Sequence, residues 1–179
     1  MRMLVAYSML VLPLAACGAR AQTAPAVPPA TAPAPVQEVL QAPQAAAPGS
    51  LQAVLTLTRH HWLLQDARDA AGKRIDALFV RADKPLQLDF NASMVSVGNA
   101  CNTLSAHQTA TADTLDIEPM ATTLMACPDV ALMALDREVG KRLQGRLGMR
   151  FGEGDSPSLM LTDAAGDVLV FSGRLPEAK

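Results

Sequence analysis

The stretches GNACNT (residues 98–103) and TLMACP (residues 123–128) contain two of the three cysteines of this chain, Cys101 and Cys127. Three interpretations of this pair compete: a disulfide, a catalytic thiol and a metal site. The disulfide requires an oxidising compartment, because thiols stay reduced in the cytosol. The choice between these interpretations therefore depends on the cellular compartment that the rest of the sequence predicts.

The amino-terminal sequence predicts export and lipid attachment, with a signal peptide over residues 1–16. Arg2 precedes an apolar run that has the length of a signal peptide and is too short to span a bilayer. The sequence LAAC (residues 14–17) resembles a bacterial lipobox, which implies cleavage between Ala16 and Cys17 and acylation of Cys17. The alternative is an ordinary secretory signal that happens to be followed by a cysteine.

Residues 17–50 predict a disordered tether behind the lipidated Cys17. This segment contains seven of the thirteen prolines, and its only charged residues are Arg20 and Glu38. Such a composition cannot bury a core, and fully extended it would span on the order of 100 Å. The residue after Cys17 is Gly18, whereas lipoproteins retained in the inner membrane have Asp at this position. In this respect the sequence resembles outer-membrane lipoproteins. We therefore expect an anchor in the outer membrane with the protein facing the periplasm.

The charge of the chain argues against two kinds of partner, nucleic acid and an anionic membrane surface. The formal net charge is −2, and only 18% of the residues are charged. No basic field is present that would attract nucleic acid or an anionic membrane surface. The expected contact with the membrane is therefore made through the lipid on Cys17.

The remaining residues predict one small domain over 51–176, with a tail at 177–179. Apolar residues alternate along short segments, as in 86–90, where Leu86, Leu88 and Phe90 share one face. Short strands must close or stack to hide their edges. We therefore predict a mostly β, α+β fold: a small antiparallel β-barrel or half-barrel of about seven or eight strands with one α-helix. Strands are expected at residues 61–66, 86–90, 94–97, 114–118, 143–151, 158–162 and 168–171.

The predicted helix follows Cys127. Pro128 and Asp129 favour a helix start, through a preset φ and a favourable charge. Apolar residues then recur at steps of three and four, at Leu132, Leu135, Val139 and Leu143. The charged residues are expected on the other faces of this helix: Asp136, Arg137, Glu138, Lys141 and Arg142.

Export favours the disulfide interpretation of Cys101 and Cys127. They are the two cysteines that remain after lipidation, and paired thiols usually oxidise outside the cytosol. A catalytic thiol needs a base, and His107 forms no local signature with Cys101. A metal site would recruit His60, His61 and His107, but no CxxC or HxxxH spacing is present. We therefore predict no catalytic residue, no metal and no cofactor.

The two cysteine stretches together resemble the META domain, as in HslJ-like envelope proteins. Residues 100–102 are similar to the family's GCN-type motif with Ala in place of Gly, and residues 123–127 match its T-x-M-A-C motif. The similarity extends over residues 59–173, but residues 104–107, ending at His107, lack the Gly and aromatic that commonly follow the first motif. The resemblance implies a small, mostly β domain with one helix, a role in envelope stress or drug tolerance, and no catalytic residues.

These observations predict a membrane-anchored, non-enzymatic envelope lipoprotein that supports envelope integrity by binding an unknown envelope protein or component. One alternative is an inhibitor of a hydrolase, which needs a protruding loop. Another is a pilot or chaperone for an outer-membrane complex, which needs an open apolar cleft in the barrel. A thiol- or metal-dependent enzyme using Cys101, Cys127 and His107 is the remaining alternative.

Overall fold

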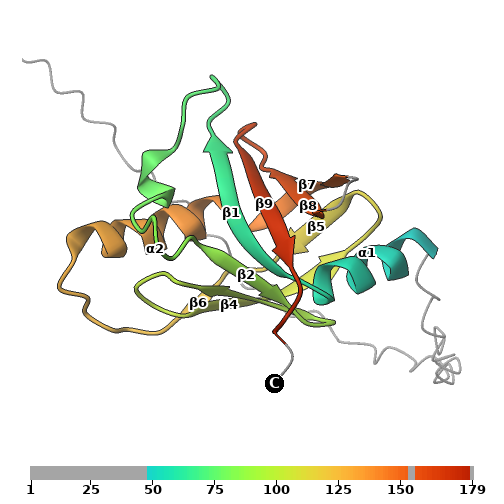
Figure 1. Ribbon diagram of the computed structural model, residues 1–179, viewed down its shortest axis with the longest axis horizontal. Helices are drawn as coiled ribbons and strands as arrows, with labels where there is room; N and C mark the ends of the chain where they lie inside the picture. Colours follow the sequence, from blue (N-terminus) through green and yellow to red (C-terminus); the bar gives the residue numbers. More distant parts are fainter. Residues whose placement is uncertain (1–47, 153–155, 178–179) are drawn as a thin grey trace, which may run out of the picture. The chain divides into compact units, whose positions relative to one another are not determined.

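The computed structural model describes residues 48–152 and 156–177 of the chain. Four predicted features fall wholly or mainly outside these ranges: the signal peptide over residues 1–16, the cleavage site between Ala16 and Cys17, residues 17–47 of the tether, and residues 178–179 of the tail. The described part contains a β-barrel and two α-helices (Figure 1).

Eight antiparallel strands close into the barrel. The ring runs β3-β2-β1-β9-β8-β7-β5-β4, and pairing between β3 and β4 completes it. The prediction of a small antiparallel barrel with mostly β structure is therefore confirmed. The strands are β1 (His61–Arg68), β2 (Gln87–Phe90), β3 (Met94–Gly98), β4 (Leu104–Ala110), β5 (Thr114–Ile117), β7 (Gly145–Gly152), β8 (Ser158–Thr162) and β9 (Val168–Arg174).

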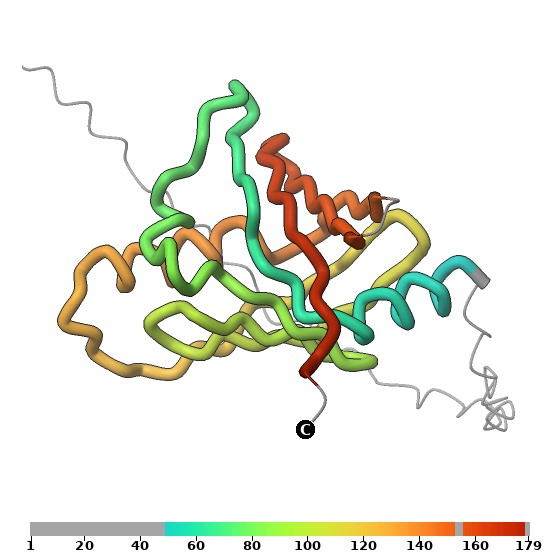
Figure 2. Tube along the Cα trace, in the orientation of Figure 1, coloured from blue at the N-terminus to red at the C-terminus, as the bar shows by residue number. Residues whose placement is uncertain are grey.

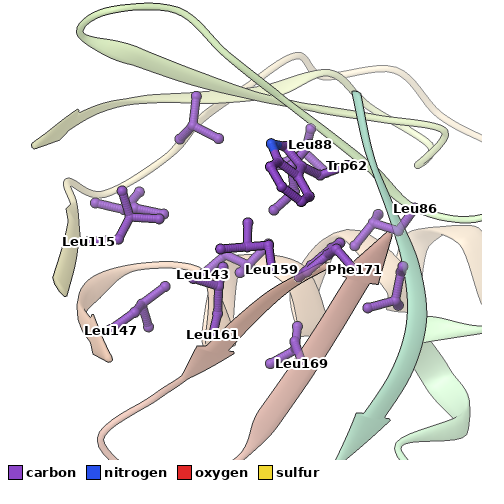
Figure 3. Close-up of a cluster of buried hydrophobic side chains, with 14 of the residues drawn as sticks. Trp62, Leu86, Leu88, Leu115, Leu143, Leu147, Leu159, Leu161, Leu169 and Phe171 are labelled. Atoms are coloured by element: carbon purple, nitrogen blue, oxygen red, sulfur yellow. The ribbon is translucent and has the colours of Figure 1, made fainter. Parts of the chain in front are cut away.

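Alternating apolar residues fill the interior of the barrel. Trp62 and Leu64 of β1 are buried, as are Leu88 and Phe90 of β2, so these faces of both strands point inward. Trp62 and Phe171 have no exposed surface. Figure 3 shows both side chains among leucines from β2, β5, β7, β8 and β9. The interior is a packed core of side chains.

A ninth strand, β6 (Ala121–Thr122), lies outside the ring. It pairs with the first residues of β4, while β5 pairs with the last ones. β4 itself was absent from the expected strands, because a polar residue interrupts its apolar alternation. Gln108 is 5% exposed and donates a hydrogen bond to the Asn91 carbonyl at 3.1 Å. A buried glutamine with such a partner is compatible with an inward-facing position.

The helix predicted after Cys127 is α2 (Val130–Arg142). The Asp129 carboxylate caps it by accepting a hydrogen bond from the Ala131 N–H at 2.8 Å. Leu135 is buried as the apolar stripe predicts, and the helix packs against the short 3₁₀-helix η1 (Asp76–Leu78).

The expectation that all charged residues of α2 face outward is wrong for two of them. Asp136 is 9% exposed and Arg142 is 7% exposed. Arg142 Nε donates to Asp167 Oδ2 at 3.0 Å, and its guanidinium also pairs with Glu138. Burial of a charged group is tolerated where an opposite charge and hydrogen bonds accompany it. Periodicity could not reveal the pairing with Asp167, because Asp167 lies in the distant turn between β8 and β9.

The structure contains a second helix that the sequence did not predict, α1 (Pro48–Thr58). Its first three residues fall in the segment expected to be tether. Ala53 and Leu57 are buried beside β2 and β4, and Trp62 Nε1 donates a hydrogen bond to the Leu57 carbonyl at 3.0 Å. Neither end of α1 has the charged residues that usually mark helix termini. Packing against the barrel therefore stabilises a helix without those signals.

Candidate functional site

The candidate site is the β6–α2 loop, residues 123–129, which connects β6 to α2. A disulfide between Cys101 and Cys127, whose Cα atoms are 6.0 Å apart, joins this loop to the connection between β3 and β4. Both cysteines are partly buried. The covalent link holds the carboxyl-terminal part of the loop against the barrel.

The Asp136 side chain of α2 holds the Cys101 end of the disulfide by hydrogen bonds. Its Oδ1 accepts a hydrogen bond from the Cys101 N–H at 2.9 Å, and its Oδ2 accepts from the Asn102 N–H at 3.1 Å and from Asn102 Nδ2 at 2.8 Å. Asn102 is 6% exposed. The carboxylate thus satisfies buried donors that would otherwise destabilise the connection between β3 and β4.

Asn102 in turn holds the loop backbone on both sides of Leu124. Its Oδ1 accepts from Thr123 Oγ1 at 2.9 Å and from the Met125 N–H at 2.7 Å. Its Nδ2 also donates to the Met125 carbonyl at 3.4 Å. The Thr123 N–H donates to the Thr103 carbonyl at 3.2 Å. The residues before and after Leu124 are therefore fixed by hydrogen bonds.

The braced loop presents apolar side chains to solvent. Leu124 is 99% exposed, Met125 is 62% exposed, and Val130 at the start of α2 is 77% exposed. Neighbouring exposed apolar side chains, such as Leu124 and Met125, are typical of interaction sites. The arrangement displays Leu124 on a backbone that is already ordered.

A shallow depression lies beneath this loop, with a volume of about 460 Å³. Met133 of α2 lines it, and Met133 Sδ lies 3.5 Å from Cys101 Sγ. Arg137 also lines it, and its Nη1 donates to the Met133 carbonyl at 3.0 Å. The depression, which Asp136 also lines, therefore combines thioether surface with a few polar groups, a chemistry suited to an apolar side chain with a polar neighbour.

A family model described as META domain matches residues 55–175. The chain belongs to the META domain family. The match covers every strand of the barrel and helix α2, and it includes both cysteine stretches. The resemblance noted in the sequence is thereby confirmed. A search of the curated proteins finds no match to the chain.

An NMR structure of a protein from Burkholderia xenovorans is similar to this META domain. It shares 21% sequence identity with a TM-score of 0.56, and the similarity covers 80% of this chain and 99% of that chain. A second NMR structure shares 22% identity with a TM-score of 0.44, over 66% of this chain and 92% of that chain. The likeness to the Burkholderia protein shows a common fold.

The remaining candidates for chemistry in the META domain do not meet at the disulfide. His107 lies on the outer face of β4, and its Cα is paired with Met94 of β3. No hydrogen bond among the described residues joins its ring to Cys101 or Cys127. Both thiols are oxidised, so neither is available as a thiolate nucleophile or metal ligand in this state.

A polar cluster on β1 and β2 was not anticipated from the sequence. His61 Nδ1 pairs with Asp89 Oδ1, and Gln87 Nε2 donates to Asp89 Oδ2 at 2.9 Å. Alternation of Leu86, Leu88 and Phe90 does place Gln87 and Asp89 on one outer face, but their pairing with His61 depends on strand register. The side chains of His61 and Asp89 are 43% and 40% exposed, which is typical of a polar contact at the surface.

His60 takes a separate position, where its Nδ1 is 3.0 Å from the Thr56 carbonyl of α1. Within residues 48–152 and 156–177, no group of three or more His, Cys, Asp or Glu side chains is placed to hold a metal ion. Over the same ranges, none of the helices has the length and apolar character needed to cross a membrane. Cys17 and Ala16, the predicted lipidation and cleavage residues, lie outside the described residues.

Proposed function

We propose that this META protein is a non-enzymatic lipoprotein of the bacterial outer membrane that binds a protein partner through its β6–α2 loop. In this role it supports envelope integrity under stress or drug exposure. The observation that carries the proposal is Leu124, 99% exposed between two hydrogen-bonded neighbours. A side chain displayed on an ordered backbone loses little conformational entropy when a partner covers it.

The anchoring part of the proposal is supported by the lipobox-like sequence that ends at Cys17. Mass spectrometry of the mature amino terminus should find Cys17 as the first residue, carrying diacylglycerol and an amide-linked acyl chain. The protein should fractionate with the outer membrane, and Cys17→Ser should release it to the soluble envelope fraction. An unmodified Cys17 in a soluble protein would contradict the anchoring.

The binding part is tested by a photo-crosslinking residue at position 124 in living cells. Leu175 is the matched control position, because it is a leucine that is 67% exposed and lies after β9, away from the loop. The expected result is a discrete adduct from position 124 that is absent from position 175 and is lost when Met125→Asp is added. Equal crosslinking from both positions would contradict a specific role for the loop.

Inhibition of a hydrolase is the second candidate, and the braced loop favours it over a pilot that carries an apolar segment in its barrel. The barrel interior is filled by side chains such as Trp62 and Phe171, which leaves the protruding loop as the better surface. Loops that block a hydrolase cleft are typically rigid before binding. The purified protein should then reduce the activity of an envelope-degrading hydrolase, and Leu124→Asp should abolish that effect.

The disulfide also supports a non-enzymatic role, because the thiol chemistry considered for Cys101 and Cys127 needs at least one free thiolate. Quantification of free thiols in protein isolated from the envelope tests this point. Stoichiometric free thiols together with a bound metal would revive the enzymatic alternative.

A further inference from the structure

The outer face of α1 exposes two leucines beside Gln52 and has no charged side chain. Leu51 is 58% exposed and Leu55 is 47% exposed, and the two residues lie one helical turn apart. Ala53 and Leu57 on the opposite face are buried against the barrel. A surface helix usually turns charged side chains toward water, whereas α1 has none. Exposed leucines on a helix without charges are typical of a face that contacts an apolar surface.

Charge is also absent from the chain on the amino-terminal side of α1. No Asp, Glu, Lys or Arg occurs between Glu38 and Arg59. Gly49 packs closely against Ala112 in the turn between β4 and β5, and that turn carries Asp113. No side chain of α1 itself is charged, so the helix has no electrostatic attraction of its own for charged lipids. Any surface that covers α1 must be held there by apolar contact.

We propose that α1 lays the face formed by Leu51 and Leu55 on the lipid surface to which the protein is anchored. This inference rests on the proposed lipid anchor at Cys17, because α1 begins about 30 residues after it, within a reach on the order of 100 Å. An anchored domain meets the bilayer at high effective concentration, so a small apolar contact suffices. A stable dimer needs about 800 Å² from each partner. Two leucine side chains offer far less than that, which argues against a second copy.

This contact orients the domain. In Figures 1 and 2, α1 and the β6–α2 loop lie at opposite ends of the barrel along its long direction. Because the two elements are this far apart, a lipid contact at α1 leaves the β6–α2 loop free to bind its partner.

The experiment places an environment-sensitive fluorophore on the full mature chain through Leu51→Cys, with Cys17→Ser so that the only free thiol is the new one. An amino-terminal histidine tag attaches this protein to phosphatidylcholine vesicles that contain a nickel-chelating lipid. The label should shift its emission to the blue and be quenched by nitroxide lipids. A label introduced by Leu124→Cys is the matched control and should remain as in water. Because the contact is apolar, added salt should leave the quenching unchanged.

Loss of the second leucine should weaken the contact. Leu55→Ser should lower the quenched fraction of the label at position 51 about fivefold, and Leu175→Ser should leave it unchanged. Water-like emission from position 51 on the chelating vesicles would overturn the inference. The chelating lipid replaces the native anchor, so the role of α1 and lipidation of Cys17 are tested separately. If the label at position 51 is quenched on these vesicles but the native protein is not lipidated, the role of α1 is supported and the anchor at Cys17 is overturned.

Discussion

Asn102 and Asp136 show how two buried polar residues shape a surface loop. Asp136 satisfies the backbone of Cys101 and both nitrogens of Asn102, which leaves the Asn102 amide oriented toward Thr123 and Met125. Neither residue is exposed, yet both decide how the exposed loop is held. Their contribution is one of position rather than chemistry.

Replacing Asp136 by Ala should therefore destabilise the domain by about 3 kcal/mol, because two buried N–H donors of Asn102 and the partly buried Cys101 N–H lose their acceptor. Urea denaturation measures the change. Asp116→Ala is the matched control, because Asp116 is half-exposed in a surface pair with Arg146 and should cost about 0.5 kcal/mol or less. Similar losses in both variants would contradict the buried role of Asp136.

Gly173 of β9 lies where a larger residue does not fit. A Cβ at this position would be 2.9 Å from Pro157 Cγ and 3.1 Å from Trp62 Cζ3. Gly173→Ala should lower stability by about 2 kcal/mol through overpacking, as measured by thermal denaturation. Gly148→Ala is the control, because its Cβ would meet Thr162 Cβ at an ordinary 3.8 Å. If the two variants melt at the same temperature, close packing at Gly173 is not limiting.

At the scale of elements, the disulfide and the α2 carboxylate join segments that the barrel hydrogen bonds leave separate. β6 contributes only two residues to pairing with β4, so the loop that follows it has little support from the sheet. The Cys101–Cys127 bond and the Asp136 hydrogen bonds supply that support from either side. The loop is consequently fixed at Thr123, at Met125 and at Cys127.

Reduction of the disulfide should lower the free energy of unfolding by about 3 kcal/mol, because a closed loop of 26 residues restricts the unfolded chain. Urea denaturation with and without reductant measures this change. Hydrogen exchange of the Met125 amide should become faster, because reduction weakens its hydrogen bond to Asn102. A Cys101→Ser, Cys127→Ser variant is the control and should show no response to reductant. An identical urea midpoint for oxidised and reduced protein would contradict the prediction.

For the whole molecule, closure of the ring and filling of its interior restrict where a partner can bind. Core side chains from most of the strands meet inside the barrel, with Trp62 and Phe171 fully buried (Figure 3). A densely packed core leaves no room for an apolar ligand. Binding must therefore use the outer surface, the loops or α1.

A fluorescent fatty acid should accordingly show no saturable one-to-one binding to the purified domain below its own micelle concentration. Trp62→Ala, which opens a cavity in the core, should lower stability by about 4 kcal/mol and serves as a positive control for an accessible interior. Saturable binding to the unmodified protein would contradict a filled barrel.

Much of the fold could be read from local patterns along the chain. Alternation at Leu86, Leu88 and Phe90 has a period of two residues, and the stripe around Leu135 and Val139 has a helical period. Both depend only on near neighbours in the sequence, so they predicted strands, a helix and a barrel class. The cysteine motifs likewise indicated the family, because their residues are contiguous.

The remaining features depend on residues that are far apart in sequence and meet only in the folded barrel. Asp136 reaches Asn102 across 34 positions, Arg142 reaches Asp167 across 25, and His61 reaches Asp89 across 28. Helix α1 forms because the barrel buries Leu57, a contact that its own composition does not encode. Short-range periodicity thus specifies most of the strands and helix α2, whereas α1 and β4 became evident only in the folded barrel. Register and ring closure decide which polar groups are buried, how Leu124 is displayed and which face of α1 remains uncovered.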